Sequence, residues 1–199
     1  MKKSLALVFA LIAFVLSGCS QVNSAATVGD REIALKELQS QVDLILSERN
    51  AVDTSQMQLE TGEDLTRTQL SYLISNLIIE ELAKEQNIEI TASELESYKT
   101  QIFENIGGEA NLPNVLVNAS IPSTGLEQVL RRDLVLRKIS EKESAAGADE
   151  STVNSKIEAL VTEKAKSLKV TINPRYGVWD VKTLSVVAAE PAGDAVTDK

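Results

Sequence analysis

One long apolar stretch, residues 65–86, constrains the fold more than any other part of the chain. It reads LTRTQLSYLISNLIIEELAKEQ, and most of its leucines and isoleucines recur at the spacing of one helical face. Three further apolar residues, Tyr72, Ile79 and Leu82, fall outside that face. A helix with apolar residues on several sides needs cover from several sides. The stretch therefore predicts a central helix about 30 Å long, with the other segments packed around it.

The segments that flank the central helix predict shorter helices. Residues 33–49 carry an apolar stripe at helical spacing, and the polar residues 50–64 predict a loop. After a short connector, Thr91-Ala92-Ser93-Glu94 has the spacing of a capping box, in which the Thr hydroxyl and the Glu carboxylate each cap a free backbone amide. This motif opens a helix that Gly107-Gly108 ends.

The second half of the chain predicts one more loop and two more helices. Residues 107–122 contain Pro113 and Pro122 and predict a loop. Thr124-Gly125-Leu126-Glu127 repeats the capping-box spacing and opens a helix that extends to about residue 143. Residues 151–168 form a final amphipathic pattern.

Short extended segments frame the helices at both ends. Gly29-Asp30 predicts a tight turn beside a short strand. Residues 170–187 favour extended structure and contain Trp179. We expect this segment to form an edge strand that packs its aromatic side chains on the helices. The fold class is mainly α: a single helical domain, residues 27–187, with a long central helix and short N- and C-terminal β-strands. Residues 188–199 predict a disordered tail.

The N-terminus has the pattern of an export signal. Two lysines precede an apolar run over residues 5–15, which is too short for a comfortable membrane span. Leu16-Ser17-Gly18-Cys19 follows and resembles the lipobox of bacterial lipoproteins. That resemblance implies a signal peptide over residues 1–18. It also implies that Cys19 carries a diacylglyceryl group on its thiol and palmitate-type acylation. The alternative is an ordinary secretory signal with an unmodified Cys near its end.

Lipidation implies a cell-membrane location on the extracytoplasmic face, with residues 19–26 as the lipidated tether. Without Lys2 and Lys3 the net charge of −9 becomes −11. An anionic membrane repels such an acidic domain, so we expect the domain to stand off on its tether. The same acidic balance excludes nucleic acid as a partner, because nucleic-acid binding needs Lys and Arg to neutralise phosphates.

The composition disfavours catalysis and metal binding. The chain has no histidine and one cysteine, which removes the usual general base, imidazole metal ligand and catalytic thiol. The carboxylates Glu80-Glu81 and Glu94/Glu96 have the spacing of solvated helix faces. We therefore expect no enzyme activity, no cofactor and no metal site.

The order of segments and three phrases resemble a known family. NIEITASELE at residues 87–96, TGLEQVLRRDLVLRKI at 124–139 and VTINPRYGVWD at 170–180 are similar to the chaperone domain of SurA- and PrsA-type folding factors, which is related to the substrate-binding part of trigger factor. The closing segment resembles that of SurA-like lipoproteins of Gram-positive bacteria, actinobacteria especially. This resemblance covers residues 27–180 and implies a cell-envelope role in protein folding.

One departure from the family pattern bears on activity. Members commonly carry a parvulin-type prolyl isomerase module between the last two helices, where this chain has only residues 144–150. A parvulin site also relies on histidines. The resemblance therefore implies the chaperone part without isomerase activity.

Three functions remain open at this point. The first is a lipid-anchored chaperone that binds unfolded or newly exported polypeptides in an apolar groove without ATP, and the second is an adaptor lipoprotein that holds one dedicated cell-envelope partner. The third, an enzyme, lacks a recognisable nucleophile motif. Five apolar residues are candidates for the groove, with ordinary core as the alternative for each; they are Tyr72, Ile79, Phe103, Leu116 and Val117. The sequence predicts no oligomeric state.

Overall fold

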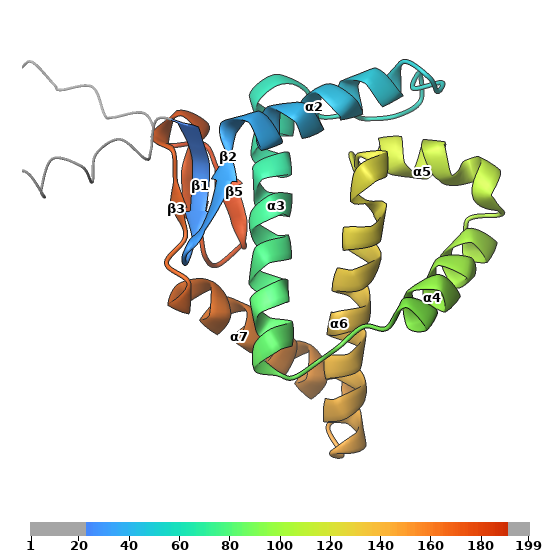
Figure 1. Cartoon of the computed structure of the whole chain (residues 1–199), viewed down its shortest axis with the longest axis vertical. Helices are drawn as coiled ribbons and strands as arrows, with labels where there is room; N and C mark the ends of the chain where they lie inside the picture. The colour runs from blue at the N-terminus through green and yellow to red at the C-terminus, as the bar shows by residue number, and fades with distance from the viewer. Residues whose placement is uncertain (1–22, 191–199) are drawn as a thin grey trace, which may run out of the picture.

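Helix α3 forms the centre of the computed structural model, which describes residues 23–190. Figure 1 shows α3 between a small β-sheet and α6, with α2 crossing one end, α7 crossing the other, and α4 and α5 beyond α6. Within the described residues, no helix has the length and apolar character needed to cross a membrane. The helices are α2 (Leu35–Arg49), α3 (Gly62–Glu85), α4 (Ala92–Asn105), α5 (Leu112–Asn118), α6 (Leu126–Ala145) and α7 (Glu150–Ser167).

The burial of α3 confirms that it is the central helix. Leu65, Leu70 and Ile74 in its first half are 0% exposed and pack against α2 and the strands. Ile79 and Leu82 in its second half pack against α6 and α7. The residues outside the main apolar face are therefore buried by different neighbours, as the sequence pattern predicts.

The strands form two small sheets beside α3. The three-stranded sheet has the order β2-β1-β3, with the Gly29-Asp30 turn joining β1 to β2 as predicted. The aromatic C-terminal segment forms the β4–β5 hairpin, which lies against α3, where the Val186 N–H donates to Ser71 Oγ at 2.8 Å. The strands are β1 (Ser24–Val28), β2 (Arg31–Ala34), β3 (Thr171–Ile172), β4 (Val178–Asp180) and β5 (Ser185–Val187).

The predicted tether over residues 19–26 is wrong in its last three residues. Ser24, Ala25 and Ala26 belong to β1 and are at most 4% exposed. β1 is the middle strand of its sheet and pairs with both β2 and β3. Ser24, Ala25 and Ala26 therefore belong to the folded domain, which the sequence pattern started at residue 27. The signal peptide, Cys19 and residues 191–199 of the predicted tail lie outside the described residues.

Two local predictions in the second half of the chain also need correction. The predicted loop over residues 107–122 contains α5, whose Leu116 and Val117 are buried. Within residues 23–190 no side chain caps the start of α6, because a short 3₁₀ turn, Ser123–Gly125, precedes that helix in place of a capping box. By contrast, Thr91 and Glu94 form the predicted capping box at the start of α4.

Candidate functional site

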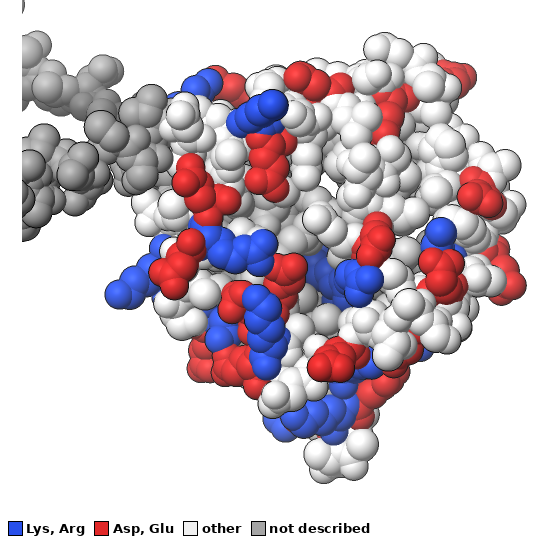
Figure 2. Space-filling model, viewed as in Figure 1, with Lys and Arg blue, Asp and Glu red and all other residues white. Residues whose placement is uncertain are grey.

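A pocket of about 340 Å³ lies between α3 and α6. Figure 2 shows the surface hollowed between these two helices, with charged side chains around the hollow. Strand β2 and the connector from α3 to α4 complete its walls. We call it the α3–α6 pocket, and its apolar lining is Ile33, Leu73, Leu77, Ile79, Ala83, Ile88, Ile90 and Val135.

The end of α3 places two of these apolar side chains. Asn87 follows the helix with φ +53, and the Ile88 N–H then donates to the Ala83 carbonyl at 2.8 Å. The Asn87 N–H donates to the Lys84 carbonyl at 3.2 Å. This pattern is a Schellman motif, in which the residue after the left-handed position packs against the helix. The motif therefore turns Ile88 back towards Ala83, and both line the pocket.

The connector that follows is fixed to α6. Lys138 Nζ donates to the Glu89 carbonyl at 2.8 Å and forms a 2.6 Å ion pair with Glu94. The Lys138 hydrogen bond and the Thr91 bonds hold the pKa of Glu94 at about 2, below its usual 4.5. Arg131 Nη1 lies 3.5 Å from the Ile90 carbonyl. These contacts hold Ile88 and Ile90 at the pocket.

The rim of the pocket is charged. Arg31 on β2 pairs with Glu80 on α3, and Arg131 on α6 pairs with Glu127 at 2.8 Å. Exposed ion pairs of this kind contribute little to stability. The pocket therefore combines an apolar floor with charged side chains that can exchange partners at low cost.

Polar and aromatic groups lie at one end of the pocket. The Tyr72 hydroxyl donates to the Gly125 carbonyl at 3.0 Å, and burial raises the pKa of this phenol. The Arg132 guanidinium lies 5.8 Å from the Tyr72 ring centroid, within cation–π range. Asn76 Nδ2 reaches Gln128 Oε1 at 3.4 Å across the two helices. The Asn76 and Gln128 amides provide donors and acceptors suited to a peptide backbone.

The five candidate groove residues do not gather at this pocket. Ile79 lines it, and Tyr72 lies beside it through Arg132. Phe103 lies on α4, where Lys99 Nζ is 5.6 Å from its ring centroid. Leu116 and Val117 are 6% and 2% exposed on α5, which packs against α2.

Of the residues that line the α3–α6 pocket, only Ile79 was named from the sequence as a binding candidate. Arg131 and Arg132 are neighbouring basic residues, a pattern that usually indicates a solvated helix face, yet both line the pocket. Ala83 and Val135 each have a pocket-lining residue four positions earlier on the same helix, Ile79 and Arg131 respectively. That i,i+4 spacing was visible in the sequence, but nothing local indicates that the two helices face each other.

The size and lining of the pocket suit the binding of an apolar side chain. Across residues 23–190, no three His, Cys, Asp or Glu side chains come together in a way that could hold a metal ion. The pocket volume falls at the small end of the range for ligand pockets. An apolar side chain fits such a floor, and the surrounding amides and charges can bind the chain that carries it.

A comparison with known protein families places the chain in a family. A comparison with protein families matches residues 2–140 to the SurA-like N-terminal domain. The match covers more than half of the chain and includes every residue that lines the α3–α6 pocket. No curated protein matched the chain, and no solved structure did.

Proposed function

Because the chain belongs to the SurA-like N-terminal domain family, we propose that it is a lipid-anchored extracytoplasmic chaperone that binds unfolded or newly exported polypeptides. The family supports a chaperone-like role in protein folding and the binding of polypeptides in general. The proposal adds that binding needs no ATP, that the chain catalyses no prolyl isomerisation, and that the binding site is the α3–α6 pocket.

The apolar floor of the α3–α6 pocket is the observation that carries this proposal. Folded proteins cover most large apolar side chains, so exposed ones are common only in unfolded polypeptides. Burial of one large apolar side chain of a client in the pocket would contribute about 1.5–3 kcal/mol. That free energy corresponds to about 10- to 150-fold in affinity. A single pocket of this kind favours broad, weak and reversible binding.

A substitution that fills the pocket tests this role. Ala83 is 8% exposed on the pocket floor, so Ala83→Phe places a phenyl ring where the client side chain would bind. Ala159 is exposed on α7 outside the pocket, and Ala159→Phe is the matched control. The assay is suppression of aggregation of several unrelated unfolded proteins by the purified full chain at near-stoichiometric ratio.

The expected result is protection by the wild-type and Ala159→Phe proteins and a loss of at least about 10-fold in affinity for Ala83→Phe. Circular dichroism must show an unchanged helix content in both variants. Equal protection by all three proteins would place client binding elsewhere. Protection of no unrelated protein would instead favour the adaptor function, and a pull-down from the membrane fraction would then search for one dedicated partner.

Membrane anchoring is a separate part of the proposal. It rests on Leu16-Ser17-Gly18-Cys19, in which Cys19 is the only cysteine of the chain. Cys19→Ala should move the protein from the membrane to the soluble fraction, and mass spectrometry of the wild-type protein should find acyl groups on Cys19. Recovery of wild-type protein without acyl groups would refute the anchoring.

A further inference from the structure

The distance between the proposed anchor and the folded domain is short. Only Ser20 to Asn23 separate Cys19 from Ser24, the first residue of β1. Five residue steps at full extension span at most about 18 Å. Helix α3 has 24 residues and is about 36 Å long. The end of the domain that holds Ser24 must therefore remain near the lipid headgroups, while the opposite end can lie much further away.

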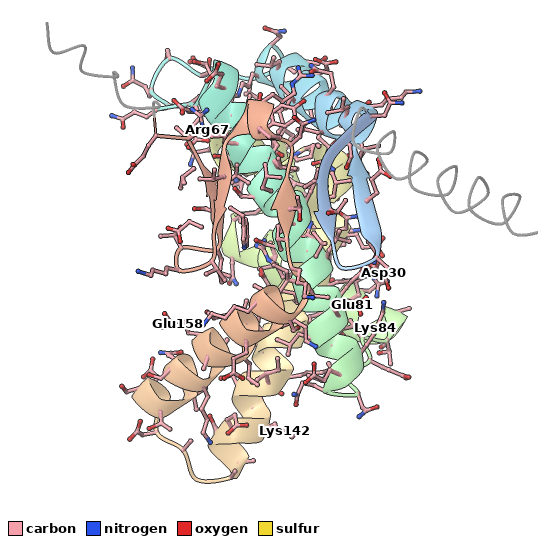
Figure 3. The ribbon with its side chains drawn as sticks, turned by 90° about the vertical axis from the view of Figure 1, so that its left-hand side faces the viewer. Asp30, Arg67, Glu81, Lys84, Lys142 and Glu158 are labelled. Atoms are coloured by element: carbon pink, nitrogen blue, oxygen red, sulfur yellow. The ribbon has the colours of Figure 1, made fainter. Side chains whose placement is uncertain are left out.

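Two hydrogen bonds fix the neighbours of Ser24. Asn173 Nδ2 donates to the Ser24 carbonyl at 2.9 Å, and the Asn173 N–H donates to the Ala25 carbonyl at 2.9 Å. The short 3₁₀ turn Pro174–Tyr176 follows Asn173 directly. It places Arg175 at the end of the domain that holds Ser24, together with the start of α3. Figure 3 shows Arg67 at this end and Lys142 at the opposite end.

The end of the domain that holds Ser24 carries a second pocket, of about 380 Å³, between α2 and the start of α3. Leu46 is 43% exposed here, which is unusual for a leucine in this chain. The Arg175 guanidinium lies 4.9 Å from the Tyr176 ring centroid and, within the described residues, forms no ion pair. We call this surface the Ser24 end, and its members include Gln39, Val42, Leu46, Arg67, Arg175 and Tyr176.

We infer that the Ser24 end faces the bilayer, where Arg175 contacts anionic lipid headgroups and Leu46 reaches the apolar boundary below them. This inference rests on the proposed lipidation of Cys19. An exposed leucine beside an arginine and a tyrosine fits the interfacial region of a membrane, in which apolar, aromatic and basic side chains are favoured together.

The charge distribution supports this orientation. Without Lys2 and Lys3 of the signal peptide the net charge is −11, so an anionic surface repels most of the domain. At the Ser24 end, Arg67 is occupied by Glu63 at 3.2 Å and Asp64 at 2.5 Å. Among the residues that line the second pocket, Arg175 is therefore the basic side chain without an ion pair. The tether is too short for the domain to stand off by more than about two Debye lengths at physiological salt.

This orientation keeps the α3–α6 pocket open to clients. The pocket lies along α3 between its two ends, lined by residues from Leu73 to Ala83. With the Ser24 end on the membrane, the hollow between α3 and α6 opens sideways (Figure 2). Newly exported chains would therefore meet the pocket within one domain length of the bilayer.

Fluorescence quenching at two positions of the full lipidated protein tests the inference. Gln39 is exposed at the Ser24 end, and Lys142 lies in the last turn of α6 at the opposite end. Gln39→Cys and Lys142→Cys are each labelled with a thiol-reactive fluorophore and reconstituted into phosphatidylglycerol–phosphatidylcholine vesicles whose headgroups carry a quencher. The lipidated Cys19 has no free thiol, so each variant takes up one label.

We expect several-fold stronger quenching at position 39 than at position 142. Adding Arg175→Glu should weaken quenching at position 39 in anionic vesicles and leave it unchanged in purely phosphatidylcholine vesicles. Equal quenching at the two positions, or stronger quenching at 142, would overturn the orientation. If the wild-type protein itself takes up label at Cys19, the lipidation has failed, which distinguishes failure of the anchor from failure of the orientation.

Discussion

A methyl group at Gly177 should disrupt the β4–β5 hairpin. Gly177 follows the 3₁₀ turn at φ +122 and ψ −146, a backbone conformation that essentially only glycine adopts. A Cβ atom at this position would lie 2.0 Å from the Val187 carbonyl oxygen. Gly108 offers a matched control, because it has φ +107 and ψ +161 but no atom within 4 Å of a Cβ.

The comparison separates backbone strain from steric overlap. Gly108→Ala and Gly177→Ala both carry a strain of about 1–3 kcal/mol. Only Gly177→Ala must also displace β5 from α3. Val186 is 5% exposed in the native structure, and its exposure by that displacement costs about 1.5–3 kcal/mol of stability. Loss of the hydrogen bond to Ser71 costs about 0.5–1.5 kcal/mol more. Gly177→Ala should therefore lower the free energy of unfolding by about 2–4.5 kcal/mol more than Gly108→Ala does.

Urea unfolding measures this difference. Circular dichroism follows the helices, and Trp179, the only tryptophan of the chain, follows the hairpin through its fluorescence. Gly177→Ala should also shift the native emission of Trp179 to longer wavelength, whereas Gly108→Ala should leave it unchanged. Equal losses of stability in the two variants, with unchanged emission in both, would refute the overlap.

Three further predictions concern the core, acid stability and the loop before α3. Leu70→Ala should cost about 2–5 kcal/mol of unfolding free energy because Leu70 is 0% exposed, whereas Leu46→Ala should stay within about 0.5 kcal/mol; equal values would contradict the burial. Glu94, with its pKa lowered from 4.5 to about 2 beside Lys138, stabilises the fold fully above pH 4.5 and loses that effect as pH falls towards 2. Glu94→Gln should therefore be less stable than wild type at pH 7 and converge with it near pH 2 in acid titrations followed by circular dichroism; a constant difference would contradict this. The two guanidinium nitrogens of Arg49 donate to the Glu60 carbonyl at 2.7 Å and to Ser120 Oγ at 3.0 Å, and a lysine cannot keep both hydrogen bonds. Arg49→Lys should therefore accelerate amide hydrogen exchange in residues 50–61. Unchanged exchange would show that this pair of hydrogen bonds is dispensable for the loop.

The sequence alone determined the features that depend on local periodicity and local hydrogen bonds. The apolar residues of 65–86 predicted the central helix, whose observed bounds are Gly62–Glu85. The Thr91–Glu94 capping box and the Gly29-Asp30 turn depend on neighbours within a few positions, and both form as predicted. One of the phrases that carry the family resemblance, NIEITASELE at residues 87–96, contains this capping box.

Only the tertiary structure decided which of these elements face each other. Ser24, Ala25 and Ala26 look like a small, polar tether in sequence, but they belong to β1, where Ala26 pairs with Ile172 almost 150 positions away and β1 becomes the middle strand of a sheet. The α3–α6 pocket likewise combines residues from Arg31 to Val135. Contacts over such separations depend on how whole elements pack, and short-range patterns carry no record of that packing.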